Sequence, residues 1–591
     1  MKKFACFVAL VFSIQNCWSA PPAFKPNVPI MHLSEVHAGM KGVAYTVFQG
    51  TRPEPMNLEV LGVLKNMNGP DSDVILIRLQ GTKPEYTGVV AGMSGSPVYI
   101  DGKLVGALAF RIGQFSKEPI AGVTPIEQML EINTLEETSA KRPASALTPV
   151  GAPGPVSGGP DVQNFASLMK PMETPLVFNG FTEEAVRRFA PQFTAAGITP
   201  VMGAGSVSND KQPEPLVPGS AVSAVLVRGD LSIAATCTVT YVDPERLLAC
   251  GHPLLQFGNV DIPMNKAQVV ATLPSPENAF KIINTTEAVG AFVQDRHTGI
   301  LGRFDQTPDM IPVTLRVHGV SNPKTFHYEV LNNPKLTPVA IMSTAYSVLQ
   351  GINEYGEDVT YRLNGQIDVH GYPEVKLQDM FAPSSDGNVP TAAALAMSLG
   401  DRFGRIYDNQ FVKPSITGVE LDFDILNERR WARLESARTD VTEARPGDQI
   451  TIEAALRPYR GERIVRQLPI QIPTSTPKGT LRILVSDADT LDKMRKSARP
   501  FAQRLDLAST IAMLNKERIN DRLYVSLLEQ NPEAMVQDKI MPTLPLSVMN
   551  VMEGMRGTQE MVVLGESSVG EESTPVDYVV SGAQVITITI K

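Results

Sequence analysis

Residues 88–109 read GVVAGMSGSPVYIDGKLVGALA, a glycine-rich turn with a serine followed by two short apolar runs. Within it, Gly92 and Gly95 bracket Ser94 in a tight turn, because glycine adopts backbone torsions that other residues avoid and lets another group approach closely. The pair Asp101-Gly102 lies between two apolar runs and predicts a β-hairpin directly after the turn. A serine held on such a turn is typical of a nucleophile whose own backbone N–H contributes to an oxyanion hole.

An alternation of apolar and polar residues extends the β pattern on both sides of this stretch. It runs over 43–47 and 58–64, and it is strongest over 417–475; a period of two residues indicates half-buried strands. Helical patterns are confined to 182–197, 391–406 and 500–535, and a last strand is predicted over 583–590. We therefore expect a mostly β protein with short helical segments.

The turn resembles the nucleophile loop of chymotrypsin-like serine peptidases, Gly-Asp-Ser-Gly-Gly-Pro, which also leads into a hairpin. It is closer to the loop of the stage IV sporulation protein B serine peptidase family, Gly-Met-Ser-Gly-Ser-Pro, which is the sequence of residues 92–97. The resemblance implies a chymotrypsin-like double β-barrel, with Ser94 as nucleophile and the N–H groups of Gly92 and Ser94 as oxyanion hole. The alternatives are a plain β-turn, or Ser96 as the reactive hydroxyl, although Ser96 stands at a glycine position of the broader pattern.

A serine hydroxyl needs a base to act as a nucleophile, and the chain offers seven histidines. His252 follows a predicted strand in Cys250-Gly251-His252-Pro253, which resembles the Leu-Gly-His segment that carries the family's catalytic histidine. We expect His252 to be the base, with a packed or solvated histidine as the alternative. The other six stand in less informative settings: His32, His37, His297, His318, His327 and His370.

The order of the two residues departs from the family, whose members place the histidine first. Here Ser94 precedes His252, and residues 143–160, with five prolines and four glycines, form a linker that suits neither a helix nor a central strand. A circular permutation, with the serine half first, is the simplest explanation. Triads occur in several chain orders on unrelated folds, so the order does not argue against catalysis.

The third member of a triad cannot be assigned from the sequence. The family has an aspartate about fifteen residues before the serine, where this chain has Leu79. Asp71, Asp73 and Glu85 are neighbouring alternatives, and Asp261 lies close to His252. A dyad oriented by a backbone carbonyl, or a catalytically silent protein, is also consistent with this departure. The family's usual peptide-binding domain of the PDZ type is not evident either.

Cys237 and Cys250 flank the predicted turn at 243–246 almost symmetrically. In an antiparallel hairpin they can therefore be near-opposite partners. A disulfide between them is the hypothesis for an exported protein, and two buried thiols are the alternative.

Composition excludes several classes of protein. The 591 residues carry a net charge of −9, which argues against a general nucleic-acid surface. Four cysteines are too few for a disulfide-rich mini-scaffold. The histidines show no metal-ligand spacing and no phosphate-binding glycine loop is present, so we expect neither a metal nor a cofactor.

Residues 1–20 have the layout of a secretory signal peptide. Lys2 and Lys3 precede an apolar run of eleven residues, which is too short to span a bilayer. Cleavage after Ser19 or after Ala20 is possible, and a membrane anchor or a lipid-modified Cys17 is the alternative. We expect an exported protein, periplasmic or extracellular, without a membrane span after cleavage.

The length suggests about four domains. We expect the following organisation: a signal peptide at 1–20, a serine-bearing barrel half at 31–137, a linker with a short helix at 138–215, a histidine-bearing barrel half at 216–340, a mixed connecting region at 341–415, a β-sandwich-like domain at 416–490, and a helical segment with a terminal strand at 491–591.

Two functions are consistent with these residues. The first is an exported serine endopeptidase that acts on protein or peptide substrates in the cell envelope, with Ser94 activated by His252. The second is a catalytically silent relative that serves as an envelope binding or scaffolding protein. The intact loop at 92–97 favours the first function and the leucine at position 79 favours the second. The sequence predicts no nucleic-acid partner and leaves the oligomeric state open.

Overall fold

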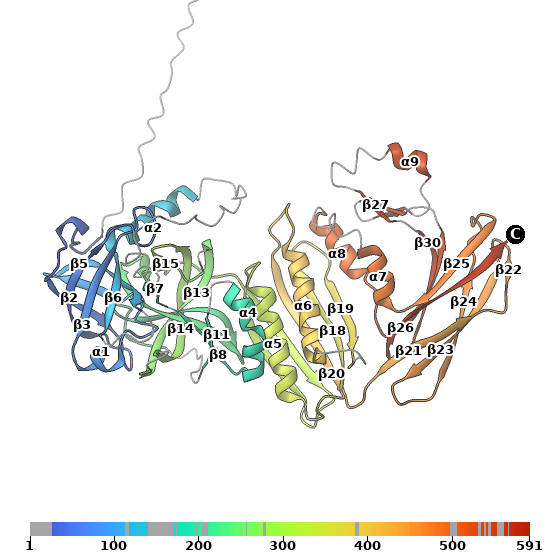
Figure 1. The fold of residues 1–591 in the computed structure, drawn as a ribbon, viewed down its shortest axis with the longest axis horizontal. Coiled ribbons are helices and arrows are strands. Elements are labelled where there is room, and N and C mark those ends of the chain that lie inside the picture. The colour runs from blue at the N-terminus through green and yellow to red at the C-terminus, as the bar shows by residue number, and fades with distance from the viewer. Residues whose placement is uncertain are drawn as a thin grey trace, which may run out of the picture.

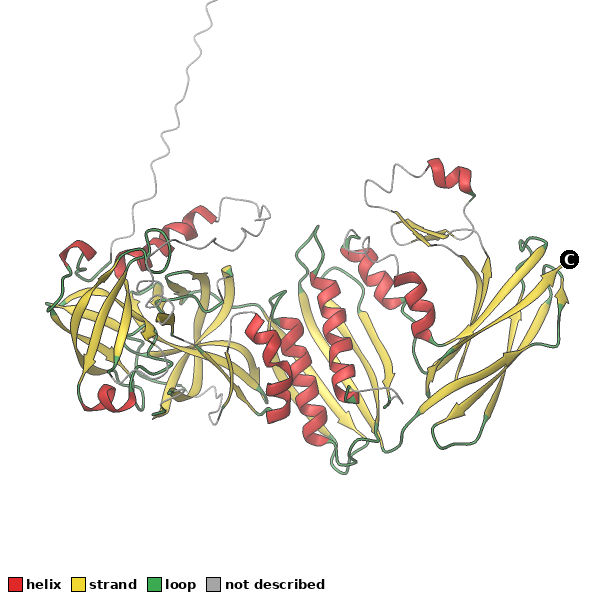
Figure 2. Cartoon of the chain, in the orientation of Figure 1, coloured by secondary structure: helices red, strands yellow, loops and turns green. Residues whose placement is uncertain are grey.

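The computed structural model describes residues 26–112, 118–139, 169–172, 174–195, 199–203, 211–255, 257–275, 279–383, 389–496, 505–529, 533–536, 539–541, 545–551, 561–564 and 567–591. Strands dominate these residues, which confirms the mostly β fold class. The parts form an elongated row, with two barrels at one end, a helix-covered sheet in the middle and a sandwich at the other end (Figures 1 and 2). The predicted signal peptide and the Pro/Gly-rich linker at 143–160 lie outside the described residues.

The first barrel carries Ser94. Its strands pair in the order β4-β1-β2-β3-β6-β5, and β4 also pairs with β5, so the antiparallel sheet closes on itself. The strands are β1 (Lys41–Thr46), β2 (Glu54–Leu64), β3 (Val74–Gln80), β4 (Pro97–Ile100), β5 (Lys103–Ile112) and β6 (Ile120–Pro125), with β7 (Met169–Pro171) added on β5. Alternate residues such as Leu58, Val60 and Ile77 fill the interior, as the two-residue period predicts.

The second barrel carries His252 and is closed in the same way. Its pairing order is β10-β13-β14-β15-β12-β11, and β11 returns to β10. The strands are β10 (Ala221–Gly229), β11 (Ser232–Val242), β12 (Arg246–Ala249), β13 (Gly258–Leu273), β14 (Phe280–Arg296) and β15 (Gly299–Arg303). The two closed six-stranded barrels give the double-barrel architecture that the resemblance implied.

The two barrels share an apolar interface. The helix α2 (Ile126–Ser139) packs against β5 of the first barrel and β15 of the second. Ile126 and Met129 from this helix are buried with Ala107 from the first barrel and with Leu248 and Leu301 from the second. This packing fixes the barrels against each other, so that residues far apart in the sequence can meet at the junction.

A helix-covered sheet extends from the second barrel. The strands β17, β16, β20, β18 and β19 continue outward from β10, and β8 and β9 continue from β11. Three helices pack side by side on this part of the molecule (Figure 1), and their apolar faces join one continuous core with it. The elements are β8 (Pro175–Asn179), α4 (Glu183–Ala195), β9 (Thr199–Met202), β16 (Met310–His318), β17 (Lys324–Leu331), α5 (Thr337–Ile352), β18 (Thr360–Val369), β19 (Val375–Phe381), α6 (Thr391–Tyr407) and β20 (Ile416–Leu426).

The C-terminal part is a two-sheet sandwich with its own core. One sheet has the order β24-β23-β21-β31 and the other β22-β32-β25-β26-β30. The strands are β21 (Trp431–Arg438), β22 (Glu443–Ala444), β23 (Gln449–Pro458), β24 (Ile464–Gln471), β25 (Gly479–Ser486), β26 (Arg522–Glu529), β30 (Ser567–Pro575), β31 (Val579–Ser581) and β32 (Ala583–Ile590). We expected a sandwich over 416–490, but β20 pairs with β16 and β18 in the middle sheet, and strands as late as 590 complete the sandwich.

The helix expected over 500–535 is much shorter in the structure. The helix α8 (Leu507–Asn515) is followed by β26, in which Leu523, Val525 and Leu527 are buried in the sandwich core. The alternation of these three residues is a strand period. Smaller elements complete this region: α7 (Ala488–Lys496), β27 (Glu533–Val536), β28 (Lys539–Met541), α9 (Leu546–Val551) and β29 (Met561–Leu564).

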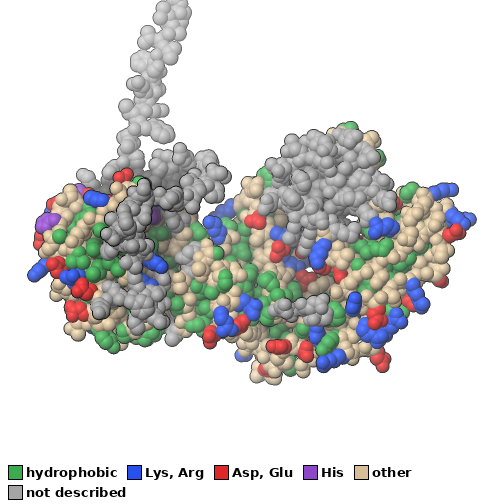
Figure 3. All heavy atoms as spheres, viewed as in Figure 1, with side chains coloured by type: hydrophobic (Ala, Val, Ile, Leu, Met, Phe, Trp, Pro, Cys, Tyr) green, Lys and Arg blue, Asp and Glu red, His purple; other side chains and the backbone are tan. Residues whose placement is uncertain are grey.

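The described part of the face seen in Figure 3 carries charged side chains of both signs. Basic and acidic side chains are intermixed over the described part of the visible face (Figure 3). Within the described ranges, none of the helices combines the length and the apolar character that crossing a bilayer requires.

Candidate active site

Ser94 lies on a turn between α1 (Thr82–Thr87) and β4 of the first barrel. Gly92 and Gly95 have φ angles of +98° and +95°, in the region that favours glycine. The Ser96 N–H donates to Met93 O (2.9 Å), and Ser96 Oγ donates to the same oxygen (2.6 Å). The hydroxyl of Ser96 therefore holds the turn together, and Ser94 is the hydroxyl left to face the second barrel.

A strand of the second barrel holds this turn in place. On β11, the Thr238 N–H donates to Ser94 O (2.7 Å) and Thr238 Oγ1 donates to Gly92 O (2.9 Å). Thr240 Oγ1 donates to Gly95 O (2.7 Å). The approach is so close that a Cβ on Gly95 would lie 2.0 Å from Thr238 O. Gly95 is therefore required at the junction of the barrels.

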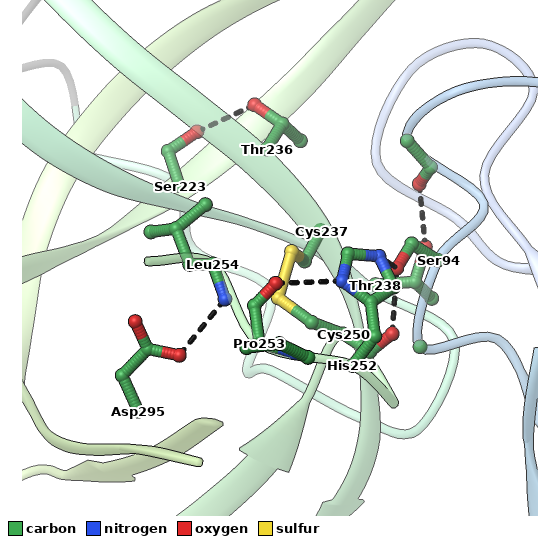
Figure 4. The surroundings of a disulfide bond; sticks show 12 residues. Ser94, Ser223, Thr236, Cys237, Thr238, Cys250, His252, Pro253, Leu254 and Asp295 are labelled. Atoms are coloured by element: carbon green, nitrogen blue, oxygen red, sulfur yellow. Dashed lines mark hydrogen bonds between the residues drawn. A yellow bond between two sulfur atoms is a disulfide. The ribbon is translucent and has the colours of Figure 1, made fainter. Parts of the chain in front are cut away.

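His252 follows β12 and meets Ser94 across the junction. Ser94 Oγ and His252 Nε2 form a hydrogen bond between residues 158 positions apart. The other ring nitrogen, Nδ1, is 2.7 Å from Pro253 O (Figure 4). Since a carbonyl only accepts, Nδ1 carries the proton and Nε2 is free to accept the proton of Ser94. A backbone carbonyl thus orients this imidazole.

Burial lowers the pKa of His252 to about 4, against a smaller raising effect of the hydrogen bond to Pro253. The imidazole is therefore neutral at pH 7, which is the form that accepts a proton. The side chains of Ser94 and His252 are both buried. Ser94 Oγ also lies 2.6 Å from Cys250 O, to which it can donate. Two acceptors therefore compete for the single hydroxyl proton of Ser94.

Two backbone N–H groups of the turn are left without a partner in the described part of the chain. Those of Gly92 and Ser94 donate to no protein acceptor there, whereas those of Met93, Gly95 and Ser96 all do. These are the two groups that the resemblance assigned to the oxyanion hole. Their availability is the property that a pocket for a developing negative charge requires.

None of the four acidic residues named above as possible triad members forms a hydrogen bond with His252. Asp73 accepts from Lys65 Nζ and from the Asn66 N–H, Glu85 from the Gly81 N–H and Asp261 from the Asp309 N–H. Asp71 donates its own N–H to the side chain of Asn66. Leu79 is buried in the core of the first barrel.

Asp295, a buried acidic residue close to the histidine loop, was not selected from the sequence. Its two oxygens accept from the N–H groups of Leu254 (2.8 Å) and Leu255 (2.6 Å), and it comes from β14. It therefore fixes the segment directly after His252. Its burial in β14 is seen in the structure alone.

A disulfide joins Cys237 on β11 to Cys250 at the end of β12 (Figure 4). Cys237 precedes Thr238, which holds the serine turn, and Cys250 provides the carbonyl that faces Ser94. Cys250 has a φ of +69°, an unusual conformation for a residue with a side chain. The bridge thus ties together the two segments that shape the site.

Five of the other histidines have side-chain contacts away from Ser94, and His370 donates its backbone N–H to Ser415 O. His32 pairs with Glu127, and His318 with Asp422 (3.6 Å). The ring nitrogens of three others contact oxygens on the chain: His37 with Ala38 O, His297 with Asn68 O and His327 with Thr314 Oγ1. Among the described residues, no three His, Cys, Asp or Glu side chains gather closely enough to hold a metal ion.

A comparison with family models matches residues 11–130 to the family described as SpoIVB peptidase S55. This match confirms the resemblance that residues 92–97 suggested, and it covers about a fifth of the chain. It includes Ser94 and ends before His252, so the order of the two halves stays a hypothesis. No curated protein and no solved structure matches the chain.

Proposed function

We propose that this protein is an exported serine endopeptidase in which Ser94 is the nucleophile and His252 the general base. One observation carries the proposal: the hydrogen bond between Ser94 Oγ and a neutral His252 Nε2 at the junction of two closed β-barrels. The family match around Ser94 supports peptide bonds as the substrate.

In the first half of the proposed reaction, Ser94 Oγ attacks the carbonyl carbon of the scissile peptide. The new O–C bond forms as the π electrons of the carbonyl move onto its oxygen, and the hydroxyl proton passes to His252 Nε2. The N–H groups of Gly92 and Ser94 stabilise the oxyanion. When the intermediate collapses, the C–N bond breaks and His252 returns the proton to the leaving amine.

In the second half, water takes the place of the amine. The oxygen of water attacks the acyl carbon while His252 accepts a proton from that water. The bond between the acyl carbon and Ser94 Oγ then breaks, and the carboxylic acid leaves. His252 then returns the proton to Ser94. Pro253 O holds the Nδ1 proton throughout, and it stabilises the imidazolium less than a carboxylate would. We therefore expect slow turnover.

Burial of the site sets a condition on this reaction. Because Ser94 and His252 are both buried, a peptide reaches Ser94 only after the segments around the junction separate. The hydroxyl must also turn from Cys250 O toward His252 Nε2. We expect the rate to depend on this rearrangement, as it does in many enzymes with closed sites.

Labelling with a fluorophosphonate probe tests the proposal. Ser94 Oγ attacks phosphorus, fluoride leaves, and the protein carries the reporter. We expect labelling of the wild type and none of Ser94→Ala, with His252→Ala reduced by about 10³-fold or more. Ser321→Ala and His327→Ala, at exposed residues of the β16–β17 hairpin, are matched controls that keep their label. A folded wild-type protein that shows no Ser94-dependent labelling contradicts the peptidase function.

A second function, binding without catalysis, is favoured by a specific observation. Ser94 Oγ is within reach of a carbonyl as well as of the imidazole, and no carboxylate among the described residues contacts His252. In that case the double barrel is a scaffold in the cell envelope, and the C-terminal sandwich is its interaction module. Absent labelling together with unchanged folding is the result that this second function predicts.

Export is the part of the proposal that concerns location. It rests on the layout of residues 1–20 and on the disulfide, since disulfides persist in oxidising compartments. We expect the mature protein in the periplasm or outside the cell, with substrates in the envelope. Sequencing the N-terminus of the mature protein after fractionation tests this; a protein that stays in the cytoplasm with residues 1–20 intact contradicts it.

A further inference from the structure

Lys281 is a buried lysine whose side chain packs against Gly92 of the serine turn. The reaction proposed above does not use it. It belongs to β14 of the second barrel, and only 2% of its surface is exposed. Its Nζ donates to Thr46 Oγ1 of β1 in the first barrel (2.7 Å). Lysine is almost never buried to this extent unless it is paired, so its position calls for an explanation.

The stem of Lys281 packs against Gly92. A Cβ placed on Gly92 would lie 3.2 Å from Lys281 Cδ, 3.4 Å from Cγ and 3.5 Å from Cβ. The backbones are joined as well: the Ala91 N–H donates to Ala279 O (2.9 Å), and the Lys281 N–H donates to Ala91 O (3.2 Å). Lys281 is thus fixed to Ala91 and Gly92, the first residues of the turn that carries Ser94.

The amine has no countercharge in the described part of the chain. Its recorded partner there is the neutral hydroxyl of Thr46, and burial alone lowers its pKa, to about 7. The charged side chains on the elements around it, β1, β13 and β14, are Lys41, Asp261, Lys266, Glu287, Asp295 and Arg296, and the serine turn adds none. Lys266 pairs with Glu287, and Asp295 holds the loop after His252.

A buried charge without a partner is costly in the resting protein. The cost falls when an anion forms nearby, and the reaction proposed for Ser94 creates one at the N–H groups of Gly92 and Ser94. An interaction that is stronger in the transition state than in the ground state accelerates the reaction. A buried ammonium whose aliphatic stem packs against Gly92 has this property.

We propose that Lys281 is a positioning residue of the active site, whose buried ammonium compensates the oxyanion that forms at Gly92 and Ser94. This inference rests on the proposed peptidase function. Lys281 transfers no proton and forms no bond in the reaction. It fixes Gly92 through its stem and supplies the positive charge that the turn lacks.

The pH dependence follows from two ionisations. His252 must be neutral, so the rate rises as the pH passes about 4. Lys281 must be protonated, so the rate falls again as the pH passes about 7. The apparent second-order rate of fluorophosphonate labelling reports groups of the free protein. We therefore expect a bell-shaped profile with limbs near these two values.

The substitution Lys281→Met keeps the length of the stem and removes the charge. We expect the labelling rate at pH 6 to fall roughly ten- to hundredfold, below the loss of about 10²–10³ for a direct oxyanion donor. The loss should lie in the rate of bond formation and not in the affinity for the neutral probe. The basic limb should disappear, so that wild type and variant converge above about pH 9.

Stability separates this role from a structural one. Since Lys281→Met removes an uncompensated buried charge, its melting temperature should equal or exceed that of the wild type. Lys266→Met, on the neighbouring strand β13, is the control that keeps both the rate and the basic limb. Thr46→Val removes the hydroxyl that holds the amine, and should lower the rate less than Lys281→Met does.

Four results overturn the inference. The first is a fluorophosphonate labelling rate of the wild type that stays constant from pH 7 to about pH 9. This measurement needs no variant. The second is a folded Lys281→Met variant with the wild-type rate, and the third is a variant that melts earlier yet keeps the basic limb. In the fourth, Lys281→Met weakens only the binding of acidic peptides, which would assign Lys281 to substrate recognition.

Ser94-dependent labelling in any of these four cases leaves the proposed peptidase function standing. Absence of Ser94-dependent labelling in the wild type contradicts both proposals.

Discussion

The imidazole of His252 shows how one residue obtains its chemical state from its surroundings. Burial excludes water and keeps the ring neutral, and the carbonyl of Pro253 decides which nitrogen carries the proton. The resulting Nε2 faces Ser94 without help from a carboxylate. Orientation by a carbonyl is weaker than orientation by an aspartate, but it leaves the neutral tautomer that a general base requires.

Gly95 lies at a close approach of the two barrels. In Gly95→Ala the new methyl group would lie 2.0 Å from Thr238 O at a φ of +95°. We expect the variant to lose about 3 kcal/mol or more of unfolding free energy, through backbone strain and displacement of the second barrel. Urea denaturation measures this loss, and fluorophosphonate labelling of the remaining folded protein should fall with it.

Gly102 is the matched control for this substitution. It also has a positive φ, +76°, but a Cβ there would have no heavy atom within 4 Å. Gly102→Ala should therefore cost only the strain, about 1 kcal/mol, and leave labelling intact. Equal losses of unfolding free energy in the two variants would show that the contact with Thr238 does not contribute to stability.

Residues of the candidate site were recognisable in the sequence where the signal was local. Ser94 stands in a six-residue turn of defined spacing, and His252 is followed at once by Pro253. Lys281 and Asp295 gave no such signal, because their roles come from the pairing of β14 with distant segments. A lysine in a strand normally faces solvent, and only the fold shows that this one is buried.

At the level of elements, the disulfide between β11 and β12 connects stability to the site. We expect the double variant Cys237→Ala/Cys250→Ala to unfold with about 3 kcal/mol less free energy, the typical effect for a bridge closing a short loop. Labelling should also slow, because Cys250 O and Thr238 both contact the serine turn. Denaturation and labelling of oxidised protein provide the comparison.

Reduction supplies the control for this prediction. Wild-type protein with its bridge reduced should match the double variant in both stability and rate, and reductant should leave the variant unchanged. A wild type that keeps its rate after reduction, with two free thiols counted, would separate the bridge from the geometry of the site.

Elements were predictable to the extent that their pattern was regular. Helices expected over 182–197 and 391–406 correspond to α4 (Glu183–Ala195) and α6 (Thr391–Tyr407). The alternation over 417–475 predicted strands, but it did not show that β20 joins the middle sheet while β21 begins the sandwich. That division depends on partners such as β16 and β31, which lie far away in the sequence.

At the scale of the whole molecule, the C-terminal sandwich is linked to the helix-covered sheet through α8. Leu507, Ile511 and Leu514 on this helix are buried in the core of the middle part, and Arg405 of α6 pairs with Glu517 just after it. The links lie in the middle of the row, away from the barrels that carry Ser94 and His252 (Figure 1). The sandwich therefore supports the middle sheet without contributing to the site.

This separation predicts that damage at α8 affects stability and not chemistry. Ile511→Ala should lower the free energy of unfolding by about 2–5 kcal/mol, because the side chain is buried and leaves a cavity. Ile511→Val, which removes one methyl group, should cost about 0.5–1.5 kcal/mol. Under conditions where all three proteins are fully folded, the fluorophosphonate labelling rate should be the same. If the rate fell in the same order as stability, the sandwich would be coupled to Ser94, since the closed site must open for each reaction and the middle sheet continues into the barrel that carries His252.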